Sequence, residues 1–359
     1  MNMQKDKKRI AIRHLLSAFF FLMAAGGIFV LKFFLTDSYL PNGTEAIIDE
    51  VLDEEIPEFV TGETGYADSD GVKIWYEVLC KTEAPKGTIL LIRGYTRSAL
   101  SWKPSFYEPL LAAGYQVIRF DNREAGLSTT FEHMGTPSLL ALIWAYLHGK
   151  PIEVPYTLDD MSNDAVGLLD ELGIESAHVV GGSLGGMIAQ MMAIHHPHRL
   201  RTLTSMLSST NDPWLPPPRP TALIVLRSAP QDRAGYLEHK LKVNRALRGG
   251  GFPANEAYIQ EQAMRLYDRS RPSAGASRQM AAVMASTRSR RKGLRSIPVP
   301  TLVIHGSADP LLPIKHGIHT AQVIPKAKLV IIDGLGHELP PSAWPQVVDA
   351  IARHAGAHT

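Results

Sequence analysis

The sequence predicts an α/β protein built around a mostly parallel β-sheet. Short, continuously apolar segments such as Thr88–Ile92 and Gln116–Phe120 are typical of parallel strands buried on both faces. These segments alternate along the chain with segments of helical character. A glycine-rich turn at residues 181–185 joins one such strand to a helix. At 359 residues the chain is long enough for one large domain or two modest ones.

The elements follow one another in a regular order. Residues 65–79 predict a hairpin, because alternating apolar residues follow the turn at 68–71. A helix is expected at 158–172, where Thr157 supplies an N-cap and Gly173 stops it. The remaining strands are expected at 177–180, 203–207, 301–304 and 329–332, and the remaining helices at 185–195, 313–323 and 343–354.

A helical insertion interrupts the alternation at residues 211–295. It begins with Pro213 and a proline-rich run at 216–220, and it contains few strand signals. We interpret it as a cap over the edge of the sheet, with the core formed by residues 61–210 and 296–359. Trp214, Leu215 and Tyr267 are candidates either for lining a pocket under the cap or for packing within it.

The N-terminus predicts a membrane segment. Residues 15–31 are apolar and uncharged, and residues 1–13 are basic. We interpret residues 1–36 as an uncleaved anchor in a lipid bilayer, with a cytoplasmic N-terminus and the rest of the chain outside. A cleaved signal peptide, which would give a secreted or periplasmic protein, is the alternative. Residues 37–60 form an acidic linker.

Composition excludes several classes of function. With 37 Lys and Arg against 35 Asp and Glu, the net charge of +2 argues against a broad nucleic-acid-binding face. The single cysteine, Cys80, rules out an intrachain disulfide and a cysteine-cluster metal site. No cofactor is predicted.

Ser183 is the candidate nucleophile. It lies in Gly181-Gly182-Ser183-Leu184-Gly185, a G-x-S-x-G motif with a strand before it and a helix after it. The glycines allow neighbouring chain to approach closely, and the N-terminus of the helix favours developing negative charge.

A serine hydroxyl needs a base, and the base needs an acid. His337 follows the last strand on a loop that should emerge at the same sheet edge as Ser183, whereas His305 is expected to be structural and His316 to lie on a helix surface. Asp309 gives the chain order Ser, Asp, His and is the expected acid, with Asp333 as its competitor.

Two backbone N–H groups should stabilise an oxyanion. Leu184 follows the nucleophile, and Tyr95 lies in the loop after the strand Thr88–Ile92, where Gly94 permits the turn.

These motifs, together with residues 121–128 and 156–161, resemble those of α/β-hydrolases close to the aclacinomycin methylesterase-like esterases. The resemblance implies the α/β-hydrolase fold with a helical cap and a Ser183-His337-Asp309 triad acting on carboxylic esters through an acyl-enzyme. The chain departs from such families at Arg93, where a histidine is usual. The alternatives are a C–C bond hydrolase, lactonase or acyltransferase using the same triad, or a membrane-tethered ligand-binding protein with little turnover.

Overall fold

The computed structural model describes residues 59–138, 141–142, 144–145, 148, 150–226, 229–270, 273–286 and 290–358. All of the described residues belong to the second of two units of the chain, Ile48–Thr359. The predicted membrane anchor at residues 1–36 therefore lies outside the described residues. Within the described residues, every helix is too short or too polar to span a bilayer.

An eight-stranded sheet forms the centre of the second unit, in the order β1-β2-β4-β3-β5-β6-β7-β8. The pairs β1–β2 and β2–β4 are antiparallel, and the strands from β4 to β8 are parallel to one another. The predicted mostly parallel sheet is thus confirmed. The strands are β1 (Glu63–Ser69), β2 (Val72–Leu79), β3 (Thr88–Ile92), β4 (Gln116–Phe120), β5 (Ala177–Gly182), β6 (Leu200–Met206), β7 (Thr301–Gly306) and β8 (Lys328–Ile332).

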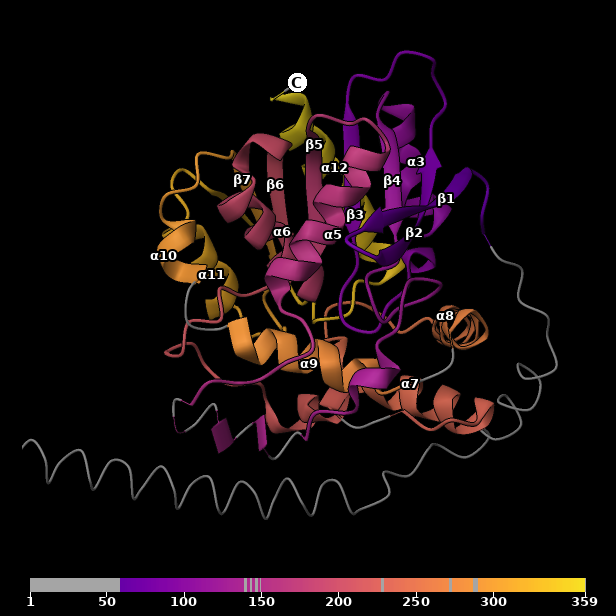
Figure 1. Ribbon diagram of the computed structural model, residues 1–359, viewed down its shortest axis with the longest axis vertical. Helices are drawn as coiled ribbons and strands as arrows, with labels where there is room; N and C mark the ends of the chain where they lie inside the picture. Colours follow the sequence, from indigo (N-terminus) through magenta and orange to yellow (C-terminus); the bar gives the residue numbers. More distant parts are fainter. Residues whose placement is uncertain are drawn as a thin grey trace, which may run out of the picture. The chain divides into compact units, whose positions relative to one another are not determined.

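Helices cover both faces of the sheet. Helices α3 and α12 pack on one face, and α5 and α6 pack on the other (Figure 1). The α-helices are α3 (Pro104–Ala112), α5 (Leu158–Glu171), α6 (Leu184–His195), α7 (Arg233–Leu247), α8 (Glu256–Arg269), α9 (Gly275–Ala285), α10 (Arg290–Leu294), α11 (Lys315–Val323) and α12 (Trp344–Gly356). Short 3-10 helices lie at Ala99–Ser101, Glu132–Met134, Pro197–Arg199, Pro220–Leu226 and Pro341–Ala343. Helix α3 is absent from the sequence-based expectations.

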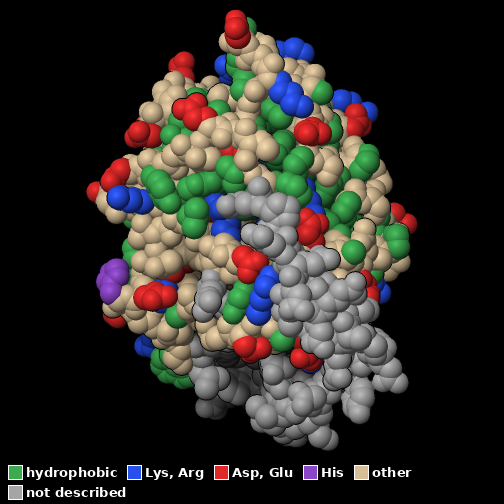
Figure 2. Space-filling view, turned by 90° about the vertical axis from the view of Figure 1, so that its right-hand side faces the viewer, with side chains coloured by type: hydrophobic (Ala, Val, Ile, Leu, Met, Phe, Trp, Pro, Cys, Tyr) green, Lys and Arg blue, Asp and Glu red, His purple; other side chains and the backbone are tan. Residues whose placement is uncertain are grey.

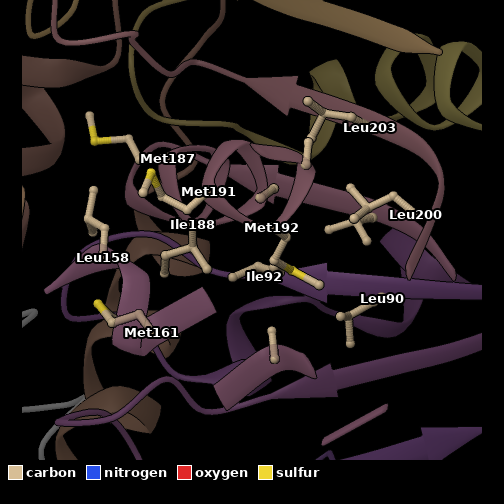
Figure 3. Close-up of a cluster of buried hydrophobic side chains, with 14 of the residues drawn as sticks. Leu90, Ile92, Leu158, Met161, Met187, Ile188, Met191, Met192, Leu200 and Leu203 are labelled. Atoms are coloured by element: carbon tan, nitrogen blue, oxygen red, sulfur yellow. The ribbon is translucent and has the colours of Figure 1, made fainter. Parts of the chain in front are cut away.

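The strand β3 shows how the core forms. Its side chains alternate between the two faces, so Ile89 and Leu91 pack with α3 and α12 while Leu90 and Ile92 pack with α5 and α6. Figure 3 shows Leu90 and Ile92 beside methionine and leucine side chains of α5 and α6. Each of the four strand residues is fully buried, which stabilises the fold by about 1.5–3 kcal/mol per side chain.

Helices α7 to α10 lie in the chain between β6 and β7, inside the segment expected to form a cap. Figure 1 places α7, α8 and α9 together at one end of the sheet. The interpretation of Trp214 as pocket lining or cap core is wrong, because this side chain is 89% exposed. Tyr267 packs within the cap, where its hydroxyl donates a 2.8 Å hydrogen bond to the carbonyl of Gln231.

The expectation that His316 lies on a helix surface is also wrong. Its ring is buried in α11, with Nδ1 2.7 Å from the Ser209 hydroxyl and Nε2 2.9 Å from the Pro216 carbonyl. Both ring nitrogens therefore have hydrogen-bond partners, so the imidazole can be buried without leaving a polar atom unsatisfied.

Candidate active site

Ser183 occupies the sharp turn between β5 and α6. Its backbone has φ 55° and ψ −117°, a conformation that costs a non-glycine residue about 1–3 kcal/mol. The turn is held from both sides, because the Ser183 N–H donates to the Met206 carbonyl at 2.8 Å and its carbonyl accepts from the Ser208 hydroxyl at 2.8 Å. A side chain on Gly185 would overlap the carbonyl of Ile92, so the helix can approach β3 only with glycine there.

The structure brings Ser183, His337 and Asp309 together from three separate loops. Nε2 of His337 lies 2.9 Å from the Ser183 hydroxyl, and Nδ1 lies 2.7 Å from Oδ2 of Asp309. The other oxygen of Asp309 accepts the backbone N–H groups of Leu311 and Leu312 at 2.9 and 2.8 Å. These bonds fix the carboxylate and leave Nε2 of His337 facing the serine.

The competing acid, Asp333, lies elsewhere. Its carboxylate accepts a 2.8 Å hydrogen bond from the Ser307 hydroxyl, which in turn accepts the N–H of Gly334 at 2.7 Å. Asp333 thus ties together the loops after β7 and β8. His305, which the sequence marks as structural, is buried and bonds through Nε2 to the Leu312 carbonyl at 2.7 Å.

The electrostatics suit a base and its acid. Burial alone would lower the pKa of His337, but the Asp309 carboxylate and its hydrogen bond outweigh burial and hold the pKa above its ordinary value. Burial alone would raise the pKa of Asp309, but His337 and the backbone amides hold it below its ordinary value. The pair therefore favours an ionised aspartate beside a histidine that readily accepts a proton.

The loop after β3 runs beside the nucleophile. A Cβ atom on Gly94 would lie 3.1 Å from Cβ of Ser183. The backbone of this loop, in which Tyr95 follows Gly94, therefore runs close to the nucleophile. Leu184 is the first residue of α6, and the first amides of a helix have no acceptor within it. Burial raises the pKa of the Tyr95 phenol to about 12, so the phenol stays neutral at physiological pH.

Side chains that sequence reasoning missed hold this loop in place. Gln279 of α9 accepts the Thr96 N–H at 3.0 Å and donates to the Arg123 carbonyl at 3.0 Å. Asn122 donates to the Arg93 carbonyl at 2.8 Å. Asn122 and Arg123 belong to the motif at residues 121–128, but no sequence signal marks Gln279 as a partner of Arg123 or of Thr96.

Two buried ion pairs join the same motif to the cap. Arg269 of α8 lies 3.0 Å from Asp121, and Arg278 of α9 binds Glu124 through two nitrogens at 2.5 and 2.9 Å. Asp121 also accepts the N–H of Ala99 at 2.6 Å. The motif therefore fixes the cap to the sheet edge.

In the described part of the chain, His, Cys, Asp and Glu side chains do not gather in groups of three that could hold a metal ion. On the face shown in Figure 2, acidic and basic side chains are interspersed over the described surface.

The chain is similar to known proteins in sequence and in fold. Residues 87–341 match a family described as alpha/beta hydrolase fold. The chain is 31% identical to rhodomycin D methylesterase DauP of Streptomyces sp. (strain C5), over 81% of this chain and 97% of the relative. It is 30% identical to 2-hydroxymuconate semialdehyde hydrolase of Pseudomonas sp. (strain CF600), over 56% of this chain and 67% of the relative. A solved structure, the meta-cleavage product hydrolase of Pseudomonas fluorescens IP01, shares the fold with a TM-score of 0.63 at 17% identity, over 82% of this chain and 98% of that one.

Proposed function

Because the chain belongs to the alpha/beta hydrolase fold family, we propose that it is a serine hydrolase that cleaves carboxylic esters at Ser183. The observation that carries the proposal is the continuous hydrogen-bonded path from the Ser183 hydroxyl through His337 to Asp309. Identity to a methylesterase over most of both chains supports an ester as the substrate.

In the proposed mechanism, the Ser183 oxygen attacks the ester carbonyl and its proton passes to Nε2 of His337. The carbonyl oxygen becomes an oxyanion, which the N–H groups of Tyr95 and Leu184 stabilise. His337 then gives the proton to the departing alcohol as the C–O bond breaks, leaving an acyl-enzyme. Water attacks the acyl group, loses a proton to His337 and releases the carboxylic acid, and the proton returns to Ser183.

A fluorophosphonate probe tests the nucleophile. The wild type should be labelled and should hydrolyse p-nitrophenyl esters, and Ser183→Ala should lose both, with kcat falling by up to about 10⁶. An unlabelled wild type without esterase activity would favour the ligand-binding alternative.

A second candidate is hydrolysis of a carbon–carbon bond by the same three residues. Similarity to the 2-hydroxymuconate semialdehyde hydrolase supports it. Relative kcat/KM for a methyl ester and for a ring-cleavage ketone substrate separates the two functions.

We also propose that residues 1–36 anchor the enzyme in a lipid bilayer, with the catalytic unit on the outer side. The uncharged run at residues 15–31 behind a basic N-terminus supports this location. The full chain should sediment with membranes and have an intact N-terminus by mass spectrometry, whereas recovery of a shortened soluble form would indicate cleavage.

A further inference from the structure

A group of basic side chains lies beside the proposed catalytic residues. Arg93 and Arg97 flank Tyr95 in the loop after β3, and Lys240 comes from α7 of the cap. We call these three residues the basic cluster. Each of the three residues is half-buried, so part of each remains accessible to solvent.

The basic cluster carries more positive charge than its surroundings neutralise. Glu338 pairs with Arg97 at 2.7 Å, but no carboxylate in the described part of the chain lies within ion-pair distance of Arg93 or Lys240. Arg93 stacks on Trp102 with its guanidinium carbon 4.4 Å from the ring centre, and its buried Nε has no hydrogen-bond acceptor there. Lys240 Nζ lies 5.0 Å from the Tyr236 ring centre.

This arrangement is costly without a ligand. Buried charges in proteins are normally paired, because desolvation of an unpaired ion is not repaid. Burial, with repulsion from Arg97, lowers the pKa of Lys240 to about 7 and that of Arg93 to about 10. An anion placed among the three side chains would supply the missing counter-charge.

The basic cluster also lies next to the reacting atoms. Arg93 precedes Gly94, whose backbone packs against Ser183, and Glu338 follows His337 directly. Glu338 and Tyr258 also line a cleft of about 560 Å³ between the ends of α7 and α8 and residues 338–342. The cleft reaches the basic cluster through Glu338, which pairs with Arg97.

We propose that Arg93, Arg97 and Lys240 bind an anionic group, such as a carboxylate, carried by the substrate whose ester bond is cleaved at Ser183. The proposal rests on the proposed hydrolase function and adds a class of substrate to it. The guanidinium forks and the ammonium match carboxylate oxygens in charge and in hydrogen-bond geometry. The anion can belong to the acyl part or to the alcohol part of the ester.

Two pairs of esters distinguish these sources. The first pair is mono(p-nitrophenyl) adipate and its distal primary amide, which differ in charge on the acyl side. The second pair is p-carboxyphenyl butyrate and p-carbamoylphenyl butyrate, which differ on the alcohol side. The wild type should prefer the anionic member of one pair by about tenfold to a hundredfold in kcat/KM, the range expected for hydrogen bonds to a charged group. Equal rates within both pairs would overturn the proposal.

Lys240→Met keeps the length of the side chain and removes its charge. It should lower the ratio of anionic to neutral kcat/KM by about tenfold, and Lys240→Arg should restore the ratio. Lys242→Met is the matched control, because Lys242 lies on the same helix and pairs with Glu238. An unchanged ratio in Lys240→Met would contradict the proposal.

Fluorophosphonate labelling of Ser183 keeps the two proposals separate. If the protein is labelled and cleaves the neutral esters but shows no preference for anionic esters, the anion-site proposal is wrong and the hydrolase proposal stands. A protein that is not labelled and cleaves none of the esters refutes the hydrolase function itself. If Lys240→Met does not fold, inhibition of neutral-ester cleavage by adipate, compared with adipamide, still tests the site in the wild type.

Discussion

The backbone carbonyl of Leu247, the last residue of cap helix α7, accepts the N–H of His337 at 2.6 Å. Two further bonds join the same segments, since Gly336 donates to the Arg248 carbonyl at 3.0 Å and Gly251 donates to the Gly334 carbonyl at 2.9 Å. Helix α7 and the residues after it therefore hold the backbone of the loop that carries the proposed base.

Gly336→Ala should displace that loop. A methyl group at position 336 would overlap the Leu247 carbonyl and the backbone of Arg248, and neither can move like the end of a flexible side chain. We expect kcat to fall by at least about tenfold and the rate of fluorophosphonate labelling to fall with it, because a small shift of a catalytic group is costly. Gly250→Ala is the control, since a methyl group there would meet nothing within 4 Å. Wild-type kcat in Gly336→Ala would show that this contact does not position His337.

Gln279→Ala should weaken the stabilisation of the oxyanion by the loop after β3, which contains Tyr95. It removes the acceptor of the Thr96 N–H, and Thr96 directly follows the proposed donor Tyr95. The effect should appear mainly in kcat, by about tenfold, with a smaller change in KM, because the oxyanion forms only after substrate has bound. Ser277→Ala on the same helix should leave both constants unchanged. A change confined to KM would instead assign Gln279 to substrate binding.

The two candidate acids can be separated by matched amides. Asp309→Asn should lower kcat on the order of 10⁴, because an amide no longer stabilises the required histidine tautomer. Asp333→Asn should keep kcat within about twofold, because that carboxylate bonds to the Ser307 hydroxyl rather than to His337. The reverse result would transfer the role of the acid to Asp333.

The pH dependence should report His337. The base must be neutral, so kcat/KM for an uncharged ester should fall as the pH falls through the pKa of His337. Because that pKa is raised, the half-maximal point should lie above the ordinary value of 6.5. Glu338 raises the pKa further and Arg97 opposes it, whereas burial alone would lower it. In Asp309→Asn the residual activity should therefore persist to lower pH, and an unshifted profile would contradict this electrostatic account.

The sequence was sufficient to predict those elements whose side chains follow a regular pattern or a known motif. Apolar runs such as Thr88–Ile92 identified the buried strands, and the motif around Ser183 requires a tight strand-to-helix turn. Asp309 and His337, which the sequence singled out because each follows a strand, lie with Ser183 at one sheet edge.

Contacts between distant segments were not predictable in this way. Leu247 acts on His337 through a backbone carbonyl, which any residue possesses, and Gln279 meets Thr96 across 183 positions of sequence. His316 has polar character, yet it is buried because Ser209 and Pro216 happen to satisfy both ring nitrogens. Such contacts depend on the packing of the cap, for which the sequence carries no periodic signal.

The buried ion pairs Asp121–Arg269 and Glu124–Arg278 limit how the cap segment can be exchanged between related proteins. Removing one member of such a pair leaves an unpaired ion, at a cost of about 3–5 kcal/mol. A chimera that replaces residues 211–295 with the corresponding segment of a relative will fold well only if the graft brings an arginine to meet each acid. The cap and the short segment at residues 121–128 should therefore be exchanged together, although the cap region starts 90 positions after Asp121 in the sequence.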